Sequence, residues 1–183
     1  SQVYGVSRWD KREDEHCQPT VTFEVAFFAD VPPQAKRVYL VFYGNLEAAS
    51  PAYPTDLAVS GEGLGLVVEN SHYKATLHPS SGVIDEIFLK QGVNVVFDHH
   101  LETNGALHWN PDVYAPPRTW IHTSDWDPPA GHDETIGPIF ATVKRWGPLP
   151  EYPEVECSVT YTFYAHSPYI EMSSTLDVLK DID

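Results

Sequence analysis

Polar and hydrophobic residues alternate along most of this chain with a period of two residues. In the clearest run, 73–78, the apolar residues Tyr73, Ala75 and Leu77 are separated by polar ones. A period of two is typical of a β-strand with one buried face, because successive side chains point to opposite faces of a sheet. The i, i+3, i+4, i+7 spacing of an amphipathic helix never persists for ten residues. The pattern therefore predicts an all-β protein, an antiparallel β-sandwich.

Turn-forming residues divide this alternating pattern into separate strands. Residues 37–43 carry aromatic and β-branched side chains on both faces, which favours a strand internal to a sheet. The run from His78 to Gly82 predicts the turn of a hairpin. Strands are expected at 20–27, 37–43, 57–60, 66–70, 73–77, 83–89, 93–97, 139–145, 155–164 and 169–178.

A glycine-rich run, Gly61-Glu62-Gly63-Leu64-Gly65, interrupts the strands. A phosphate-binding loop of this kind requires a following helix, whereas residues 66–70 have the composition of a strand. We interpret the run as a hinge between two sheets. It divides the chain into a small β-sandwich-like domain, 1–62, and a second β domain, 63–183.

Residues 98–146 stand apart from the alternating pattern. They contain four of the five tryptophans and five of the nine histidines, together with six prolines that disfavour regular structure. Their aromatic content is too high for a solvated linker. Long ordered segments without regular structure are usually functional in compact domains. We therefore predict an ordered, irregular loop that carries the functional site.

Composition and charge exclude several classes of function. The net charge of −15 disfavours nucleic acid as a partner, since phosphate binding needs a basic surface. No apolar run approaches the roughly 20 residues of a membrane helix, so no membrane partner is expected. Of the two cysteines, Cys157 lies on the apolar phase of a strand, which favours a buried free thiol over a bridge to Cys17. Such a bridge would imply an oxidising compartment.

Two stretches of the second domain resemble a known fold. VENSHYKATL at 68–77, with SGVIDEI at 81–87 and KQG at 90–92, resembles the opening hairpin of the galactose-mutarotase-like β-supersandwich. That fold occurs in polysaccharide lyases and in the C-terminal part of α-mannosidases. GPIFATV at 137–143 and VTYTFYAHSPYIE at 159–171 are similar to its next strands. The resemblance implies that 63–183 is the first half of a supersandwich, which the remainder of a parent chain completes.

The resemblance further implies part of a secreted or periplasmic carbohydrate-active enzyme that acts on a polysaccharide or oligosaccharide. The leading hypothesis is a polysaccharide lyase that cleaves a uronate-containing polymer by β-elimination. Such a lyase needs an acid or base, a group that binds the carboxylate, and flat rings for the sugar. The candidates in 98–146 are His100, His122 and Tyr114 for catalysis, Asn104 and Arg118 for the carboxylate, and Trp109, Trp120 and Trp126 for stacking.

Other uses of the same residues are kept as alternatives. The lyase hypothesis requires no cofactor, but histidines and acids of this loop could bind Zn²⁺ or Ca²⁺. Their spacing matches no helical zinc motif and no EF-hand. The alternative function is a non-catalytic sugar-binding or scaffolding β-sandwich of an α-mannosidase-like glycoside hydrolase, and a purely structural module is the third hypothesis. The potential metal ligands are His99, His100, His108, His122, His132 and Asp133 for zinc, and Asp125, Asp127, Asp133 and Glu134 for calcium.

Overall fold

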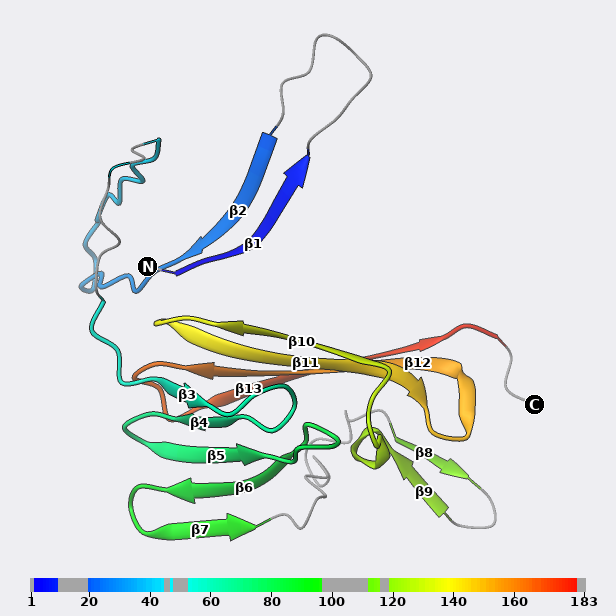
Figure 1. Cartoon of the computed structure of the whole chain (residues 1–183). Helices are drawn as coiled ribbons and strands as arrows, with labels where there is room; N and C mark the ends of the chain where they lie inside the picture. The colour runs from blue at the N-terminus through cyan, green and yellow to red at the C-terminus, as the bar shows by residue number, and fades with distance from the viewer. Residues whose placement is uncertain are drawn as a thin grey trace, which may run out of the picture. The chain divides into compact units, whose positions relative to one another are not determined.

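The computed structural model describes residues 2–9, 20–44, 47, 53–96, 112–115 and 119–180. They belong to two compact units, Ser1–Pro54 and Thr55–Asp183, so the division falls before the boundary expected at residue 62. The regular elements of these residues are antiparallel strands and one 3₁₀ turn (Figure 1). The all-β prediction is confirmed. Within the described ranges, no helix is long and apolar enough to cross a membrane.

The first unit contains one hairpin and an extended segment. Strands β1 (Gln2–Trp9) and β2 (Thr20–Ala26) pair antiparallel, with a register shift between Tyr4 and Ser7. The strand expected at 37–43 is not formed, because these residues have no ladder partner in the described part of the unit. Apolar side chains on both faces favoured an internal strand, but a strand also requires neighbouring strands to pair with.

Five short strands form the first sheet of the second unit, and each pairs antiparallel with the next. The glycine run joins the first two of them, so the predicted hinge between sheets is wrong. Gly61 has a φ of +90°, and a Cβ there would collide with the carbonyl oxygen of Gly65. The strands are β3 (Ala58–Ser60), β4 (Val67–Glu69), β5 (Tyr73–Leu77), β6 (Ile84–Leu89) and β7 (Val93–Val96).

Four longer strands form the second sheet, in the order β10-β11-β12-β13. A separate two-stranded hairpin and the 3₁₀ turn precede them in the chain. The described part of 98–146 is therefore mostly strands, and the predicted irregular loop is wrong there: Pro128, Pro129 and Pro138 lie between elements rather than preventing them. The elements are β8 (Asp112–Ala115), β9 (Thr119–His122), η1 (Thr123–Asp125), β10 (Gly131–Ile136), β11 (Phe140–Leu149), β12 (Tyr152–Tyr164) and β13 (Ile170–Val178).

The core of the second unit lies between its two sheets. Alternate residues of β5 are buried, as the period of two predicts, and they pack against alternate residues of β11 and β12. Each fully buried valine, leucine, isoleucine or phenylalanine side chain contributes roughly 1.5–3 kcal/mol through burial. The unit is thus a β-sandwich. The buried residues shared by the two sheets include Val68, Tyr73, Ala75, Leu77, Ile84, Ala141, Val143, Val159, Tyr161 and Phe163.

Buried Asn70, between β4 and β5, links the two sheets. Its side-chain amide donates to the carbonyl oxygens of Tyr164 and Ser167, at 3.0 and 2.8 Å. Its side-chain oxygen accepts from the backbone N–H groups of His72 and Tyr73, at 2.8 and 3.1 Å. All four hydrogen-bonding positions of this amide are therefore used.

Cys157 is buried in a smaller cluster between β12 and its neighbours, and it is a free thiol, as predicted. Burial, reinforced by the carboxylates of Glu156 and Asp177, raises the pKa of this thiol to about 12. It is therefore unreactive at neutral pH. Cys17 lies outside the described residues.

Candidate functional site

The β8–β9 hairpin brings three of the predicted site positions together. In its register, Tyr114 is opposite Trp120, and Asp112 is opposite His122. Positions two apart in a strand belong to the same face, so these four positions share one face of the hairpin. Only the backbone of Tyr114 and Trp120 is described.

His122 lies where β9 ends and η1 begins. Its side chain is buried, with the residue 9% exposed. Its backbone N–H donates to a carboxylate oxygen of Asp125 at 3.1 Å, which closes the turn. The following residues, Thr123 and Ser124, are buried as well. The predicted catalytic histidine thus lies at the edge of the core rather than in open solvent.

Trp126 does not present its ring to solvent, and its predicted role as a stacking surface is wrong. The residue is 6% exposed and packs with Ile121, Leu149 and Val155. Its indole N–H donates to the carbonyl oxygen of Pro148 at 2.8 Å. A large ring with its single donor satisfied in this way is a core residue.

Arg145 is fully buried beside Trp126, and sequence reasoning did not select it. Its Nη1 donates to the carbonyl oxygen of Ser81 at 2.8 Å, and its Nη2 donates to the hydroxyl of Tyr161 at 3.2 Å. The guanidinium carbon lies 5.5 and 5.4 Å from the ring centres of Trp126 and Tyr161. Among the described residues no carboxylate pairs with it. Arg145 therefore links the two sheets through carbonyl groups and aromatic faces. The sequence did indicate the burial of Arg145, because it lies two residues after Val143, on the face of β11 that points to the core.

The remaining predicted site residues are not placed. His100, Asn104, Trp109 and Arg118 lie outside the described residues. Three of the proposed zinc ligands, His99, His100 and His108, therefore lie outside them. In the described ranges, no three His, Cys, Asp or Glu side chains are grouped so as to hold a metal ion. Asp127, one of the proposed calcium ligands, instead accepts a hydrogen bond from the hydroxyl of Ser80.

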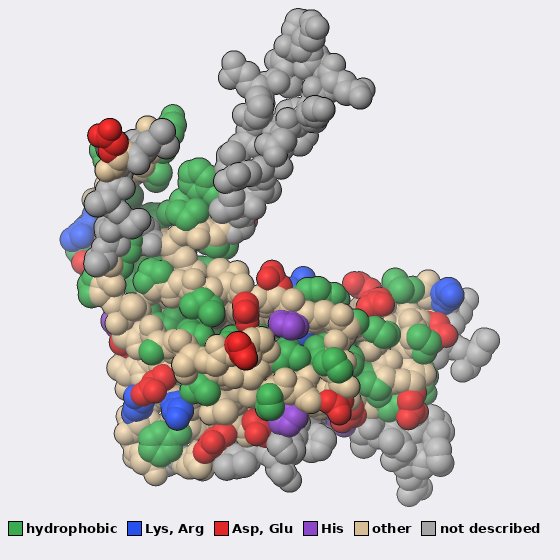
Figure 2. All heavy atoms as spheres, in the orientation of Figure 1, with side chains coloured by type: hydrophobic (Ala, Val, Ile, Leu, Met, Phe, Trp, Pro, Cys, Tyr) green, Lys and Arg blue, Asp and Glu red, His purple; other side chains and the backbone are tan. Residues whose placement is uncertain are grey.

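A pocket of about 410 Å³ lies on the outer face of the first sheet, over β4, β5 and β6. We call it the sheet pocket. Its residues share one face because the register places Lys74 opposite Glu69 and Phe88, and Thr76 opposite Glu86. Figure 2 shows basic, acidic and apolar side chains gathered over this sheet. The pocket is lined by Glu69, Lys74, Thr76, Glu86, Phe88 and Lys90.

The sheet pocket combines one exposed ring with charged groups. Phe88 is 40% exposed. Lys90 forms an ion pair with Glu69, and the hydrogen bond and charge of Lys90 lower the pKa of that carboxyl. Lys74 makes no ion pair among the described residues. The pocket therefore offers a flat apolar surface, two ammonium donors and two carboxylate acceptors.

Sequence reasoning missed the sheet pocket for a definite reason. Each of its residues looks like an ordinary member of the solvent face of an alternating strand. The signal available was Phe88, an aromatic ring on the polar phase of β6, opposite Lys74.

Comparison of the chain with protein-family models, with curated proteins and with solved structures finds no match. The resemblance to the galactose-mutarotase-like fold stays a prediction. The function proposed below therefore rests on the geometry of the described residues.

Proposed function

We propose that this chain is the saccharide-binding β-sandwich of a carbohydrate-active protein, and that the sheet pocket binds an acidic sugar. The observation that carries the proposal is the exposed ring of Phe88 surrounded by ammonium and carboxylate groups. The C–H face of a pyranose packs on such a ring, while neighbouring charged groups exchange hydrogen bonds with its hydroxyls.

A local cation provides a partner for an acidic sugar within this acidic unit. The unit Thr55–Asp183 has 6 Lys and Arg residues against 19 Asp and Glu residues, yet two of those cations, Lys74 and Lys90, line this one pocket. Lys90 is held by Glu69, which leaves the ammonium group of Lys74 to bind a uronate carboxylate. A charge-assisted hydrogen bond of this kind is roughly twice as strong as a neutral one.

Calorimetric titration with oligouronates, and with neutral oligosaccharides of the same length, tests the proposal. Phe88→Ala removes the stacking surface, worth about 1–1.5 kcal/mol, and is expected to weaken oligouronate binding about tenfold. Lys74→Gln should abolish the preference for the charged sugar while leaving neutral binding unchanged. Tyr169→Ala, at an exposed aromatic residue elsewhere in the unit, is the matched control. Equal oligouronate affinity of Phe88→Ala and the wild type would refute the proposal that the sheet pocket is the binding site.

Polysaccharide lyase activity is a second candidate, favoured by one observation. The β8–β9 register puts the positions of Tyr114, Trp120 and His122 on one face, and these residue types supply a base, an acid and a sugar platform. β-Elimination creates an unsaturated product with new ultraviolet absorbance. Its release from uronate polymers should be lost in both Tyr114→Phe and His122→Ala. Full activity in either variant would show that the replaced residue takes no part in the reaction.

A further inference from the structure

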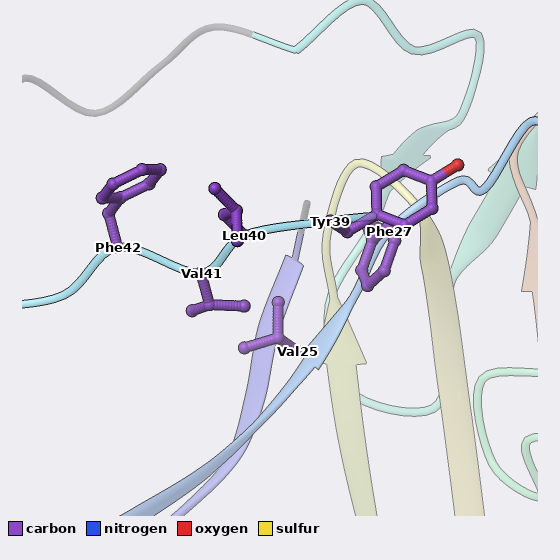
Figure 3. Close-up of a pocket in the computed structure, with 6 residues that line it drawn as sticks. All are labelled: Val25, Phe27, Tyr39, Leu40, Val41 and Phe42. Atoms are coloured by element: carbon purple, nitrogen blue, oxygen red, sulfur yellow. The ribbon is translucent and has the colours of Figure 1, made fainter. Parts of the chain in front are cut away.

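The extended segment 37–43 of the first unit exposes a row of apolar side chains. Val38 is 85% exposed, Leu40 73% and Phe42 89%. The residues between them face β2: the ring of Tyr39 lies 4.9 Å from that of Phe27. Figure 3 shows Val41 directed toward Val25, whereas Leu40 and Phe42 point away from β2. Successive side chains therefore point to opposite sides, as in a strand. Both sides are largely exposed, since Tyr39 is 42% and Val41 63% exposed.

The backbone of this segment is also unpaired. Within the described residues, the N–H and C=O groups of 37–43 form no backbone hydrogen bond, and the segment belongs to no sheet. Valine, tyrosine, leucine and phenylalanine favour strands strongly. An exposed, apolar and unpaired stretch of this kind is a template for a strand from another chain. Together with β2 it lines an apolar pocket of about 280 Å³.

Charge does not prevent two first units from meeting. The residues of Ser1–Pro54 include five Lys or Arg and seven Asp or Glu, so this unit is close to neutral. Nearly all of the net charge of −15 belongs to Thr55–Asp183. Within 37–43 the only charged side chain is Arg37. A strongly charged partner would find at most one complementary charge along the segment, that of Arg37, whereas a second copy presents an equally apolar strand.

The segment is complementary to itself when it is reversed. In an antiparallel alignment centred on Leu40, Val38 is opposite Phe42, Tyr39 is opposite Val41, and Arg37 is opposite Tyr43. Every apolar residue then meets an apolar one, no like charges face each other, and the guanidinium lies beside an aromatic ring. We propose that residues 37–43 pair with the same segment of a second copy of this chain, across a twofold axis at Leu40.

This inference goes beyond the proposed saccharide function and is independent of the sheet pocket. The pairing gives hydrogen-bond partners to the N–H and C=O groups along one edge of the segment. It is an isologous contact, in which each copy contributes the same strand. A two-stranded pair is only marginally stable by itself, so the dimer should dissociate on dilution.

Introducing a charge at Leu40, the centre of the pair, is the decisive experiment. Sedimentation velocity of the full chain over a range of concentrations should show the mass double as the concentration rises. Leu40→Lys places two ammonium groups opposite each other and should weaken dimerisation at least about tenfold, and Leu40→Glu should do the same. An equimolar mixture of the two variants should recover the dimer, because opposite charges then face each other.

The control is Tyr169→Lys, which adds the same charge at an exposed aromatic residue of the second unit and should leave the dimer intact. A wild-type chain that stays monomeric at every concentration overturns the proposal. So does a dimer that survives in Leu40→Lys alone, or a mixture of the Leu40 variants that stays monomeric. Saccharide titrations of the same variants report separately on the sheet pocket, which contains none of these residues.

Discussion

Replacing Asn70 by aspartate is the sharpest test of how the sandwich is held together. The two side chains have the same shape, so the acceptor contacts from the N–H groups of His72 and Tyr73 are retained. The two donor contacts are lost. In their place, a carboxylate oxygen faces the carbonyl oxygens of Tyr164 and Ser167 at the distances of the original hydrogen bonds, 3.0 and 2.8 Å.

The expected loss of stability follows from these contacts. Each lost hydrogen bond costs about 1 kcal/mol net, and a buried acceptor left without a donor costs about 1–3 kcal/mol. Asn70→Asp is therefore expected to lower the free energy of unfolding by about 3–5 kcal/mol. For a unit of this size each kcal/mol is worth about 3–5 °C, so the melting temperature should fall by roughly 10–20 °C.

Differential scanning calorimetry and urea unfolding, each run at pH 7 and at pH 4, measure the effect. Lowering the pH protonates the introduced carboxylate and restores one donor, so the gap to the wild type should narrow at pH 4. His72→Ala, an exposed side chain next to the same turn, is the control and should change stability by less than about 0.5 kcal/mol. A fall of less than about 1 kcal/mol in Asn70→Asp would show that this amide does not link the sheets.

Two further predictions concern buried or partly buried charges. Arg145→Lys should destabilise the second unit by about 2–4 kcal/mol in urea unfolding. An ammonium group cannot donate to both Ser81 and Tyr161 as the guanidinium does while it lies between two rings. Lys144→Arg, at an exposed position, is the control, and an equal loss of stability in both variants would contradict the role of Arg145. Burial raises the pKa of Asp56, but the hydrogen bonds it accepts from Ser71 and from the backbone N–H of His166, together with the charge of His166, lower it to about 2. Since the pKa of Asp56 is depressed, its ionised carboxylate stabilises the fold above about pH 4, and this stabilisation is lost toward pH 2. After discounting for solvent screening, the stabilisation amounts to about 1–2 kcal/mol. Asp56→Asn should remove this contribution from the acid unfolding transition.

Local sequence determined the strands wherever the alternation was clean. Residues 73–77 are the clearest case: the predicted strand has the observed bounds of β5, with Tyr73, Ala75 and Leu77 buried. The period of two is a property of the backbone itself, and burial of the apolar phase follows as soon as any second layer covers the sheet. The free thiol of Cys157 was predictable for the same reason.

Contacts between segments distant in the chain decided the rest. The segment 37–43 has the composition of a strand but lacks a ladder partner in the described structure, since pairing depends on a neighbour and not on propensity. Trp126 is chemically suited to a sugar platform, yet the carbonyl of Pro148 and the side chain of Arg145 keep it in the core. The sheet pocket exists only because the register of β4, β5 and β6 places Glu69, Lys74 and Phe88 side by side. Alternation along a strand is local and can be seen in the sequence, whereas register and sheet packing arise from the lowest free energy of the whole fold.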